Sequence, residues 1–190
     1  MSAWEALLGR RTVNEFAEVL PQGWEDKLTR ALECALYAPN HKRTEPWRFH
    51  LLGPEAARRV CELNADIVSA KKGPEAGEKK LKRWLAMPGW LVVTCKGSGE
   101  GLDAPMSPER EDYAAVCCAV QNLCVALHAD GIGTKWTTGG VNFDPRFRQA
   151  AGVPEDEYVV GTIWFGQPAG RPAPKPTKKL GLDDVLTRHD

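Results

Sequence analysis

Apolar side chains recur at helical spacing in four parts of this chain. Residues 109–129 are apolar around much of the helix circumference, which predicts a long, central and buried helix. Residues 23–37 and 55–69 carry apolar positions along one face and are predicted as amphipathic helices. A shorter amphipathic helix is predicted from Ser2 to Gly9, with Ser2 at its N-cap.

Strands are predicted where short apolar runs lie between glycine, proline or charged residues. Residues 90–95 form a continuous apolar and β-branched run, as expected of a strand that is buried on both faces. Further strands are predicted near residues 49–52, 134–138 and 159–165. Because helices outnumber strands, the pattern predicts an α+β sandwich in which helices cover one sheet.

The remaining segments have weaker patterns. Residues 70–83 are rich in lysine and glutamate, so they are predicted as a mobile excursion or a partly exposed helix. Residues 97–108 are predicted as a loop, and Asp144-Pro145 is expected to cap a short helix ending at Ala151. The proline-rich tail, residues 169–190, is predicted either to be disordered or to wrap a neighbour, with a weak helix at 182–186.

Composition narrows the classes of function. The chain has 190 residues, 43% of them hydrophobic, which is enough for one globular domain. The formal net charge is zero, so no global field favours nucleic acid or an acidic membrane surface. No basic segment followed by an apolar run opens the chain, and no apolar stretch approaches roughly 20 residues. We therefore expect a cytoplasmic protein without nucleic-acid or membrane partners.

The six cysteines are not spaced like a metal site or a redox motif. No pair has CxxC spacing, and no cysteine and histidine spacing matches a zinc site. Cys117, Cys118 and Cys124 lie in the predicted central helix, where a buried thiol acts as a small hydrophobe. We expect all six cysteines to be reduced and structural, and we assign no metal ligand.

Two polar stretches near the N-terminal end are candidates for binding a phosphorylated ligand. Arg10-Arg11-Thr12 places two permanent cations and a hydroxyl at the end of the first helix. The polar loop from Ala38 to Trp47 carries His41 and further cations, and Pro46-Trp47 anchors it before a strand. The alternative is that the arginines are solvated and only complement the helix dipole, and that the loop is ordinary.

A third candidate is the strand segment Lys135-Trp136-Thr137, which follows Gly131 and Gly133. Its cation, indole and hydroxyl are able to lie against a planar ligand, although an ordinary core strand is the alternative. A fourth is the basic cluster at residues 175–179, which is either solvated or supplies a cation to a phosphate site formed elsewhere.

Five segments resemble the nitroreductase family in the same order and with similar spacing over nearly the whole chain. They are Arg10-Arg11-Thr12, the loop from Ala38 to Trp47, the segment from Gly131 to Trp136, the strand ending Gly166-Gln167-Pro168, and Lys178-Lys179-Leu180. Their family counterparts are an Arg-Arg-Ser element, an Ala-Pro-Ser…Gln-Pro-Trp segment, a Gly-Leu-Gly segment, a late strand ending Gly-x-Pro, and a basic residue before a short terminal helix.

The resemblance implies a compact, single-domain nitroreductase spanning residues 1–190. The implied fold is an α-β-α sandwich with a central, mostly antiparallel sheet and a C-terminal arm, about residues 169–190, that wraps the partner subunit. The implied cofactor is FMN, bound at the interface of a homodimer. Hydride would pass from NADH or NADPH to flavin N5, and then to a nitroaromatic, quinone or similar acceptor by a ping-pong mechanism. The cofactor carries this chemistry, so we assign no catalytic side chain.

The resemblance also implies where the cofactor is held. Arg10 and Lys178 would hold the FMN phosphate, and Arg11 and Thr12 would contact the phosphate, the ribityl chain or the isoalloxazine edge. Tyr37 would reach the flavin of the partner subunit.

Further contacts are implied for His41, which would also reach the partner's flavin, and for Lys135, Trp136 and Thr137, which would lie along the isoalloxazine. The chain departs from the family pattern at Arg43 and Glu45, which are able to form a local ion pair instead of contacting FMN. Two rival functions remain at this point: a flavin-dependent dehydrogenase or oxidase, and a non-catalytic FMN-binding module.

Overall fold

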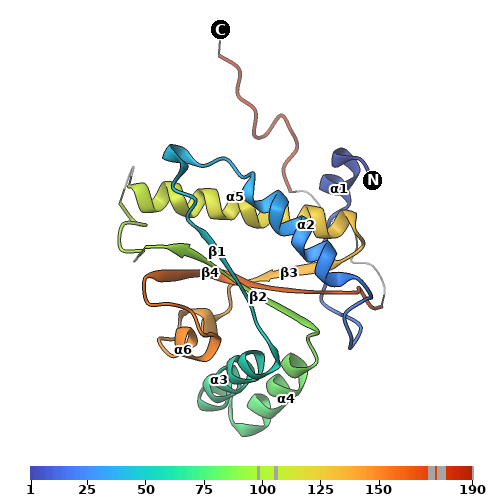
Figure 1. Ribbon diagram of the computed structural model, residues 1–190, viewed down its shortest axis with the longest axis vertical. Coiled ribbons are helices and arrows are strands. Elements are labelled where there is room, and N and C mark those ends of the chain that lie inside the picture. Colours follow the sequence, from blue (N-terminus) through green and yellow to red (C-terminus); the bar gives the residue numbers. More distant parts are fainter. Residues whose placement is uncertain (98, 105–106, 171–173, 175–178, 190) are drawn as a thin grey trace.

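The chain folds into three layers, with one sheet between two groups of helices (Figure 1). This computed structural model describes residues 1–97, 99–104, 107–170, 174 and 179–189. Four strands form the sheet, in the order β1-β2-β4-β3. They are β1 (Trp47–Leu51), β2 (Gly89–Lys96), β3 (Gly133–Thr137) and β4 (Glu157–Gly166). All three pairings are antiparallel, as predicted.

Helices cover both faces of the sheet. One face carries α2 (Trp24–Leu36) and α5 (Pro108–Ala129), and α1 (Ala3–Gly9) packs on α5. The other face carries α3 (Pro54–Lys72), α4 (Pro74–Leu85) and α6 (Phe147–Ala151). Two short 3-10 helices, η1 (His41–Arg43) and η2 (Gly140–Phe143), complete the regular structure of the described residues. The predicted α-β-α sandwich is confirmed.

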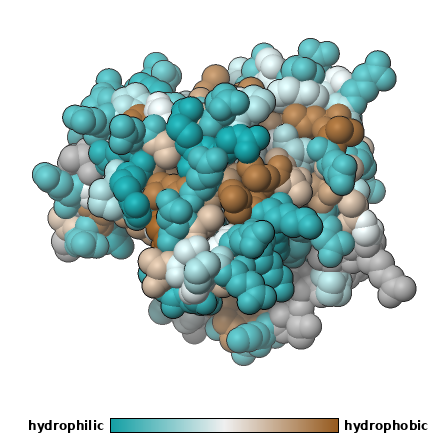
Figure 2. All heavy atoms as spheres, turned by 90° about the horizontal axis from the view of Figure 1, so that it is seen from below, coloured by the Kyte–Doolittle hydropathy of each residue, from teal (hydrophilic) through white to brown (hydrophobic). Residues whose placement is uncertain are grey.

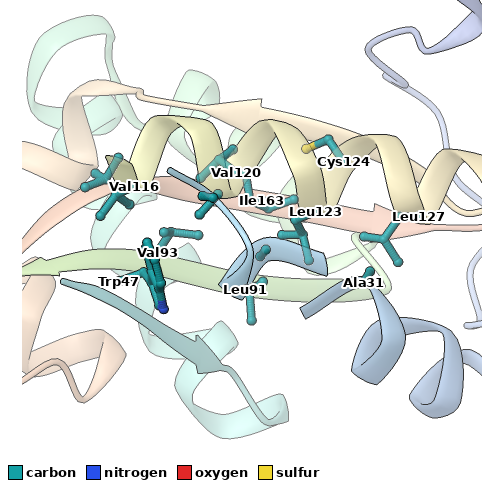
Figure 3. Close-up of a cluster of buried hydrophobic side chains, with 14 of the residues drawn as sticks. Ala31, Trp47, Leu91, Val93, Val116, Val120, Leu123, Cys124, Leu127 and Ile163 are labelled. Atoms are coloured by element: carbon teal, nitrogen blue, oxygen red, sulfur yellow. The ribbon is translucent and has the colours of Figure 1, made fainter. Parts of the chain in front are cut away.

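The larger core lies between α5 and the sheet (Figure 3). Val116, Val120 and Leu123 project from α5 toward Leu91 and Ile163 of the sheet, and all five are essentially inaccessible to solvent. Burial of side chains of this size stabilises the fold by about 1.5–3 kcal/mol each. By length and composition α5 also reaches the range of a membrane-spanning helix, contrary to the expectation that no stretch would. Its apolar inner side is used for this core.

The second core, under α3, α4 and α6, is built around three indole rings. Trp84 of α4 lies between Trp90 of β2 and Trp164 of β4, with ring centroids 5.1–5.6 Å apart in edge-to-face geometry. This arrangement favours the quadrupoles of the rings. Seen from the side of these helices, the surface is mostly hydrophilic, with apolar side chains exposed between the polar ones (Figure 2).

The segment at residues 70–83 is helical rather than a mobile excursion. The helix α3 continues to Lys72, Gly73 turns the chain with a positive φ of 90°, and Pro74 opens α4. The lysines and glutamates lie on the solvent side of α4, while Trp84 is buried. The helix is amphipathic, but its few apolar positions made it difficult to distinguish from a polar loop.

Three smaller predictions differ from the structure. Asp144 does not cap α6, which begins at Phe147; its carboxylate accepts from the Arg146 backbone N–H and side chain instead. Residues 182–186 form a single turn rather than a helix. All six cysteines are free, as expected. Cys34 and Cys118 are exposed, however, whereas we expected all six to be structural.

The first helix begins as predicted but uses its apolar side differently. Ser2 is the N-cap, and it forms a capping box with Glu5. Trp4, Leu7 and Leu8 are more than half exposed, so most of the apolar side of α1 has no cover from the described residues of its own chain. Exposed apolar side chains this close together are typical of a surface that another molecule covers.

Candidate functional site

The two neighbouring arginines after α1 have different surroundings. The Arg11 guanidinium donates through Nη1 to the carbonyl oxygens of Leu8 and Arg10, at 2.8 Å each, and so satisfies the C-terminal end of α1. Arg10 is half-buried and has no side-chain hydrogen bond or ion pair among the described residues. Its guanidinium therefore remains available to an anion.

A cavity of about 770 Å³ opens beside these residues. The chain after Arg11 runs along the outer edge of β3, where Thr12 forms a parallel bridge with Thr134 and the Val13 N–H donates to the Thr134 carbonyl. Glycines 131 and 133, the segment from Pro168 to Gly170, Asn14 and His128 complete much of the lining. The volume is in the range of small-molecule and cofactor sites.

The charge at this cavity is positive and is only partly balanced. His128, in the last turn of α5, lines the cavity with Arg11 and Thr12. Burial lowers the pKa of its imidazole, and the charges of Arg10 and Arg11 lower it further. Among the described residues that line the cavity, Glu15 is the one acidic residue. A positive field that opposes protonation of a histidine will equally attract a bound anion.

The strand β3 places its predicted site residues on two faces. Lys135 pairs with Trp164 and lies on the side of α4, while Trp136 pairs with Ile163 and lies on the side of α5. Because side chains alternate along a strand, Thr137 lies on the same face as Lys135. The side chains of Lys135 and Trp136 therefore do not converge on one ligand surface, and only the strand edge is common to both. Trp136 covers Gly161, where an added Cβ would lie 2.4 Å from the indole nitrogen.

The polar loop after α2 is strained and docked on the start of α5. Lys42, Arg43 and Glu45 have positive φ values of 56°, 52° and 46°, which are rare for residues other than glycine. The His41 Nδ1 lies 2.6 Å from Glu111 Oε2, and Thr44 Oγ1 donates to Asp112. Neither Arg43 nor Glu45 has an ion-pair partner in the described part of the chain. Strain held in place by side-chain contacts is typical of functional loops.

The predicted site residues form two groups at opposite ends of α5. Arg10, Arg11 and Thr12 lie near His128 at its last turn, whereas His41 contacts Glu111 at its first turn. At 1.5 Å per residue, the helix separates these ends by about 25 Å. Tyr37, which is 87% exposed, follows α2 just before the polar loop. One protomer alone does not bring the two groups together.

One predicted residue, Lys178, lies outside the described residues. Two site residues were missed by the sequence analysis: His128 and Asn14, whose Oδ1 accepts from Lys135 Nζ at 2.8 Å. Periodicity places His128 in the last turn of the central helix, and this was the available signal. Nothing in the sequence pairs Asn14 with Lys135, because 121 positions separate them. No group of three or more possible metal-ligating side chains occurs among the described residues.

Comparison with known proteins agrees with this arrangement of segments. The sequence profile described as "Nitroreductase family" matches residues 8–167, from the end of α1 to the end of the sheet. The chain belongs to the nitroreductase family. The match includes both groups of predicted site residues except Lys178.

Similar proteins extend over almost the whole chain. YfhC of Bacillus subtilis, named as a candidate NAD(P)H nitroreductase, is 29% identical and is matched over 96% of this chain and 92% of its own. A solved nitroreductase-like protein of Bacillus cereus has a TM-score of 0.79 at 28% identity, covering 98% and 95% of the two chains. A Bacteroides fragilis nitroreductase with bound FMN has a TM-score of 0.72 at 23% identity, covering 98% and 100%; at this identity the likeness shows the fold alone.

Proposed function

We propose that this protein is a nitroreductase-type oxidoreductase that binds FMN and uses NADH or NADPH as reductant. When bound, FMN supplies hydride transfer from the nicotinamide to a nitroaromatic, quinone or similar acceptor, the two substrates reacting in alternation. The observation that carries the proposal is the cavity beside α1, which Arg11, Thr12 and His128 line; burial lowers the pKa of His128 there, and the charges of Arg10 and Arg11 lower it further. The names of relatives such as YfhC support NAD(P)H as the co-substrate.

The residues present fit a flavin mononucleotide in size and charge. The cavity of about 770 Å³ is large enough for a phosphorylated tricyclic ligand. Arg10 has a free guanidinium, and guanidinium groups match phosphate oxygens in a bidentate manner. Thr12 offers an exposed hydroxyl beside it. The FMN-bound Bacteroides fragilis structure, which shares the fold, supports the same choice of cofactor.

Each assigned residue has a role in holding the cofactor rather than in proton transfer. Arg10, with Lys178 from the C-terminal segment, would bind the phosphate, and Thr12 would donate to it or to the ribityl chain. Lys135, held by Asn14, would place its ammonium near the N1–C2 edge of the isoalloxazine and stabilise negative charge there. The edge of β3 at Trp136 and Thr137 would border the ring system. Arg11 would add positive charge while it caps α1.

We propose that the active protein is a homodimer with FMN at the subunit interface. A two-fold axis across the middle of α5 would exchange the ends of the helix, so the polar loop of one subunit would meet the arginines of the other. The outward side of α5 suits such packing, since Ala114, Cys118, Gln121 and Val125 form a small, mostly uncharged stripe there. In this arrangement Tyr37 and His41 would contact the partner's flavin.

The C-terminal segment is the second part of the proposed interface. Residues 179–189 extend away from the three layers (Figure 1), and Leu180, Leu182 and Val185 are at least 60% exposed. An arm at about residues 169–190 that wraps the partner would cover these side chains. We treat residues 1–190 as one domain, and we place the protein in the cytoplasm without nucleic-acid or membrane partners.

The test is a visible spectrum of the purified protein, repeated anaerobically after addition of NADPH and then of NADH. We expect a protein-bound flavin spectrum that bleaches rapidly with at least one nicotinamide and returns when an acceptor is added. Bound flavin that bleaches with neither nicotinamide would favour a dehydrogenase, an oxidase or a non-catalytic FMN-binding module. No flavin after reconstitution with excess FMN would rule the proposal out.

A further inference from the structure

Two cations lie over an aromatic surface between α4 and β3, and the charge of a third acts on one of them. The Lys80 ammonium lies over the Trp84 ring, 5.9 Å from its centroid, and the Lys135 ammonium lies over the Trp164 ring at 5.4 Å. These two rings are in edge-to-face contact at 5.1 Å. The third cation, Arg83, is close enough for its charge to act on Lys135.

Nothing in the described chain neutralises this group. None of Lys80, Arg83 and Lys135 has an ion-pair partner among the described residues. Burial lowers the pKa of Lys135, and the charges of Arg83 and Lys80 lower it further. Like charges held together raise the free energy of the folded protein, and an anion placed among them would lower it.

The group borders the proposed cofactor site. Lys135 donates to Asn14 Oδ1 at 2.8 Å, and Asn14 also lines the cavity beside α1. An anion near Lys80 and Arg83 would therefore lie next to a substrate that stacks beside Lys135.

We propose that Lys80 and Arg83, together with Lys135, bind the carboxylate or phosphate of a small substrate and make the enzyme selective for anionic over neutral aromatic molecules. The inference rests on the proposed flavin-dependent reduction and names the class of molecule that it acts on. The anion is carried either by the electron acceptor or by the dinucleotide, and the experiment distinguishes these sources.

The test compares two acceptors that differ mainly in charge, 4-nitrobenzoate and its methyl ester, with the FMN-loaded protein. In the double variant Lys80→Ala, Arg83→Ala we expect kcat/KM for 4-nitrobenzoate to fall about tenfold or more, as for loss of a charge-assisted contact. The ester should change by less than about twofold on the same reasoning. The matched control, Lys79→Ala with Lys82→Ala, removes two exposed charges from the same helix and should leave the ratio unchanged.

A second arm assigns the anion to the dinucleotide. The variant could leave the ratio of kcat/KM for the two acceptors unchanged and raise KM for NADPH relative to NADH. In that case the bound group is the 2′-phosphate, which supports the anion site but not the selectivity between acceptors. An equal fall in kcat/KM with both acceptors and both nicotinamides would overturn the inference. So would an unchanged kcat/KM with all four substrates. If the alanine variant does not fold, Lys80→Gln with Arg83→Gln preserves the packing of the stems and is measured in the same way.

Failure of the proposed function remains distinguishable from failure of the inference. Benzoate cannot be reduced by hydride transfer here, so its binding is followed without turnover by the intrinsic tryptophan fluorescence of the protein, to which Trp84 and Trp164 contribute. A titration that saturates in the native protein and weakens about tenfold in the double variant supports the site even if no nitro compound is reduced. A titration without saturation, or one that is equal in both proteins, contradicts it.

Discussion

Arg10 and Arg11 show how neighbouring residues of one type divide between structure and ligand binding. Arg11 donates to two carbonyl oxygens at the end of α1, whereas the Arg10 guanidinium is unpaired among the described residues and its charge adds to burial in lowering the pKa of His128. The sequence left open whether this pair is solvated and complements the helix dipole or binds a phosphate. The local geometry assigns capping to Arg11, and we assign the phosphate mainly to Arg10.

We therefore expect Arg10→Ala to weaken FMN binding and Arg11→Ala to lower the stability of the fold. Arg10→Ala should lower the affinity for FMN by about tenfold to a hundredfold, because a charge-assisted contact is lost. It should leave the affinity for riboflavin, which has no phosphate, unchanged. Arg11→Ala should cost about 0.5–1.5 kcal/mol of stability through its lost capping bonds. Quenching of flavin fluorescence on binding and urea unfolding measure these effects; equal losses of FMN and riboflavin with Arg10→Ala would contradict the assignment.

His128 makes a second prediction at this scale. Its pKa is lowered in the folded protein, so below its ordinary value of 6.5 the unfolded chain binds the proton more readily. The free energy of unfolding should then fall as pH drops below about 6.5, and the histidine should contribute no slope above that value.

The measurement is urea unfolding of the native protein and of His128→Asn at pH 7.5 and pH 5.5. Other groups titrate equally in both proteins, so the difference isolates this residue. We expect His128→Asn to lose less stability between the two pH values. Parallel losses in the two proteins would show that neither burial nor the arginine charges lower the pKa of this imidazole in the folded protein.

At the scale of elements, α4 is fixed by an unusually close approach to α3. A Cβ built at Gly77 would lie 1.8 Å from Ser69 Oγ and 2.7 Å from the Ala65 carbonyl oxygen. Glycine therefore serves here as a spacer that lets two helices touch, although it weakens the helix itself. The same contact determines where Lys80 and Arg83 stand relative to β3.

Gly77→Ala should consequently destabilise the protein, although alanine is the better helix former by about 1 kcal/mol. Overpacking of this kind costs typically 1–3 kcal/mol, and the backbone carbonyl of Ala65 cannot rotate away. Glu78→Ala, at the next and exposed position, should change stability by less than about 0.5 kcal/mol. Thermal unfolding of both variants checks this; a rise in melting temperature with Gly77→Ala would show that the two helices separate freely.

The elements were predictable where burial dominates and less so where polar surface dominates. The strand at 90–95 and the helix at 109–129 were predicted closely, because both are continuously apolar and both are buried. The helix α4 was left open, because lysines and glutamates obscure its single buried face. Lys135 and Trp136 point to opposite faces because side chains alternate along a strand. Treating Lys135-Trp136-Thr137 as one motif ignored this alternation.

At the scale of the whole molecule, the site is divided by its longest helix. The resemblance to the family placed residues from both ends of α5 in one binding site. The family profile matches the segments at both ends of the helix. Local patterns cannot show that the segments of Arg10 and His41 lie at opposite ends of α5, about 25 Å apart along the helix axis, because only packing against α5 determines this separation. The division is the main argument for the proposed dimer, since a second subunit would complete the proposed site.

A charge in the outward stripe of α5 should separate dimer formation from folding. We expect Ala114→Arg to give a folded monomer with much weaker FMN binding, because the guanidinium would lie in the proposed interface against the partner's α5 and be desolvated. Light scattering after gel filtration gives the mass, and circular dichroism gives the fold. Ala70→Arg, at an exposed position of α3, is the matched control and should remain dimeric. A dimeric Ala114→Arg that keeps its flavin would place the interface elsewhere.

The outer edge of β3 has a consequence for the behaviour of the protein at high concentration. The segment after α1 pairs with this edge at Thr134, where the Val13 N–H donates to the Thr134 carbonyl oxygen. An edge that is covered at its start offers only a short row of hydrogen bonds to a strand from another molecule. The sheet is thereby protected against edge-to-edge aggregation, because the rest of β3, from Lys135 to Thr137, is too short to start a fibril.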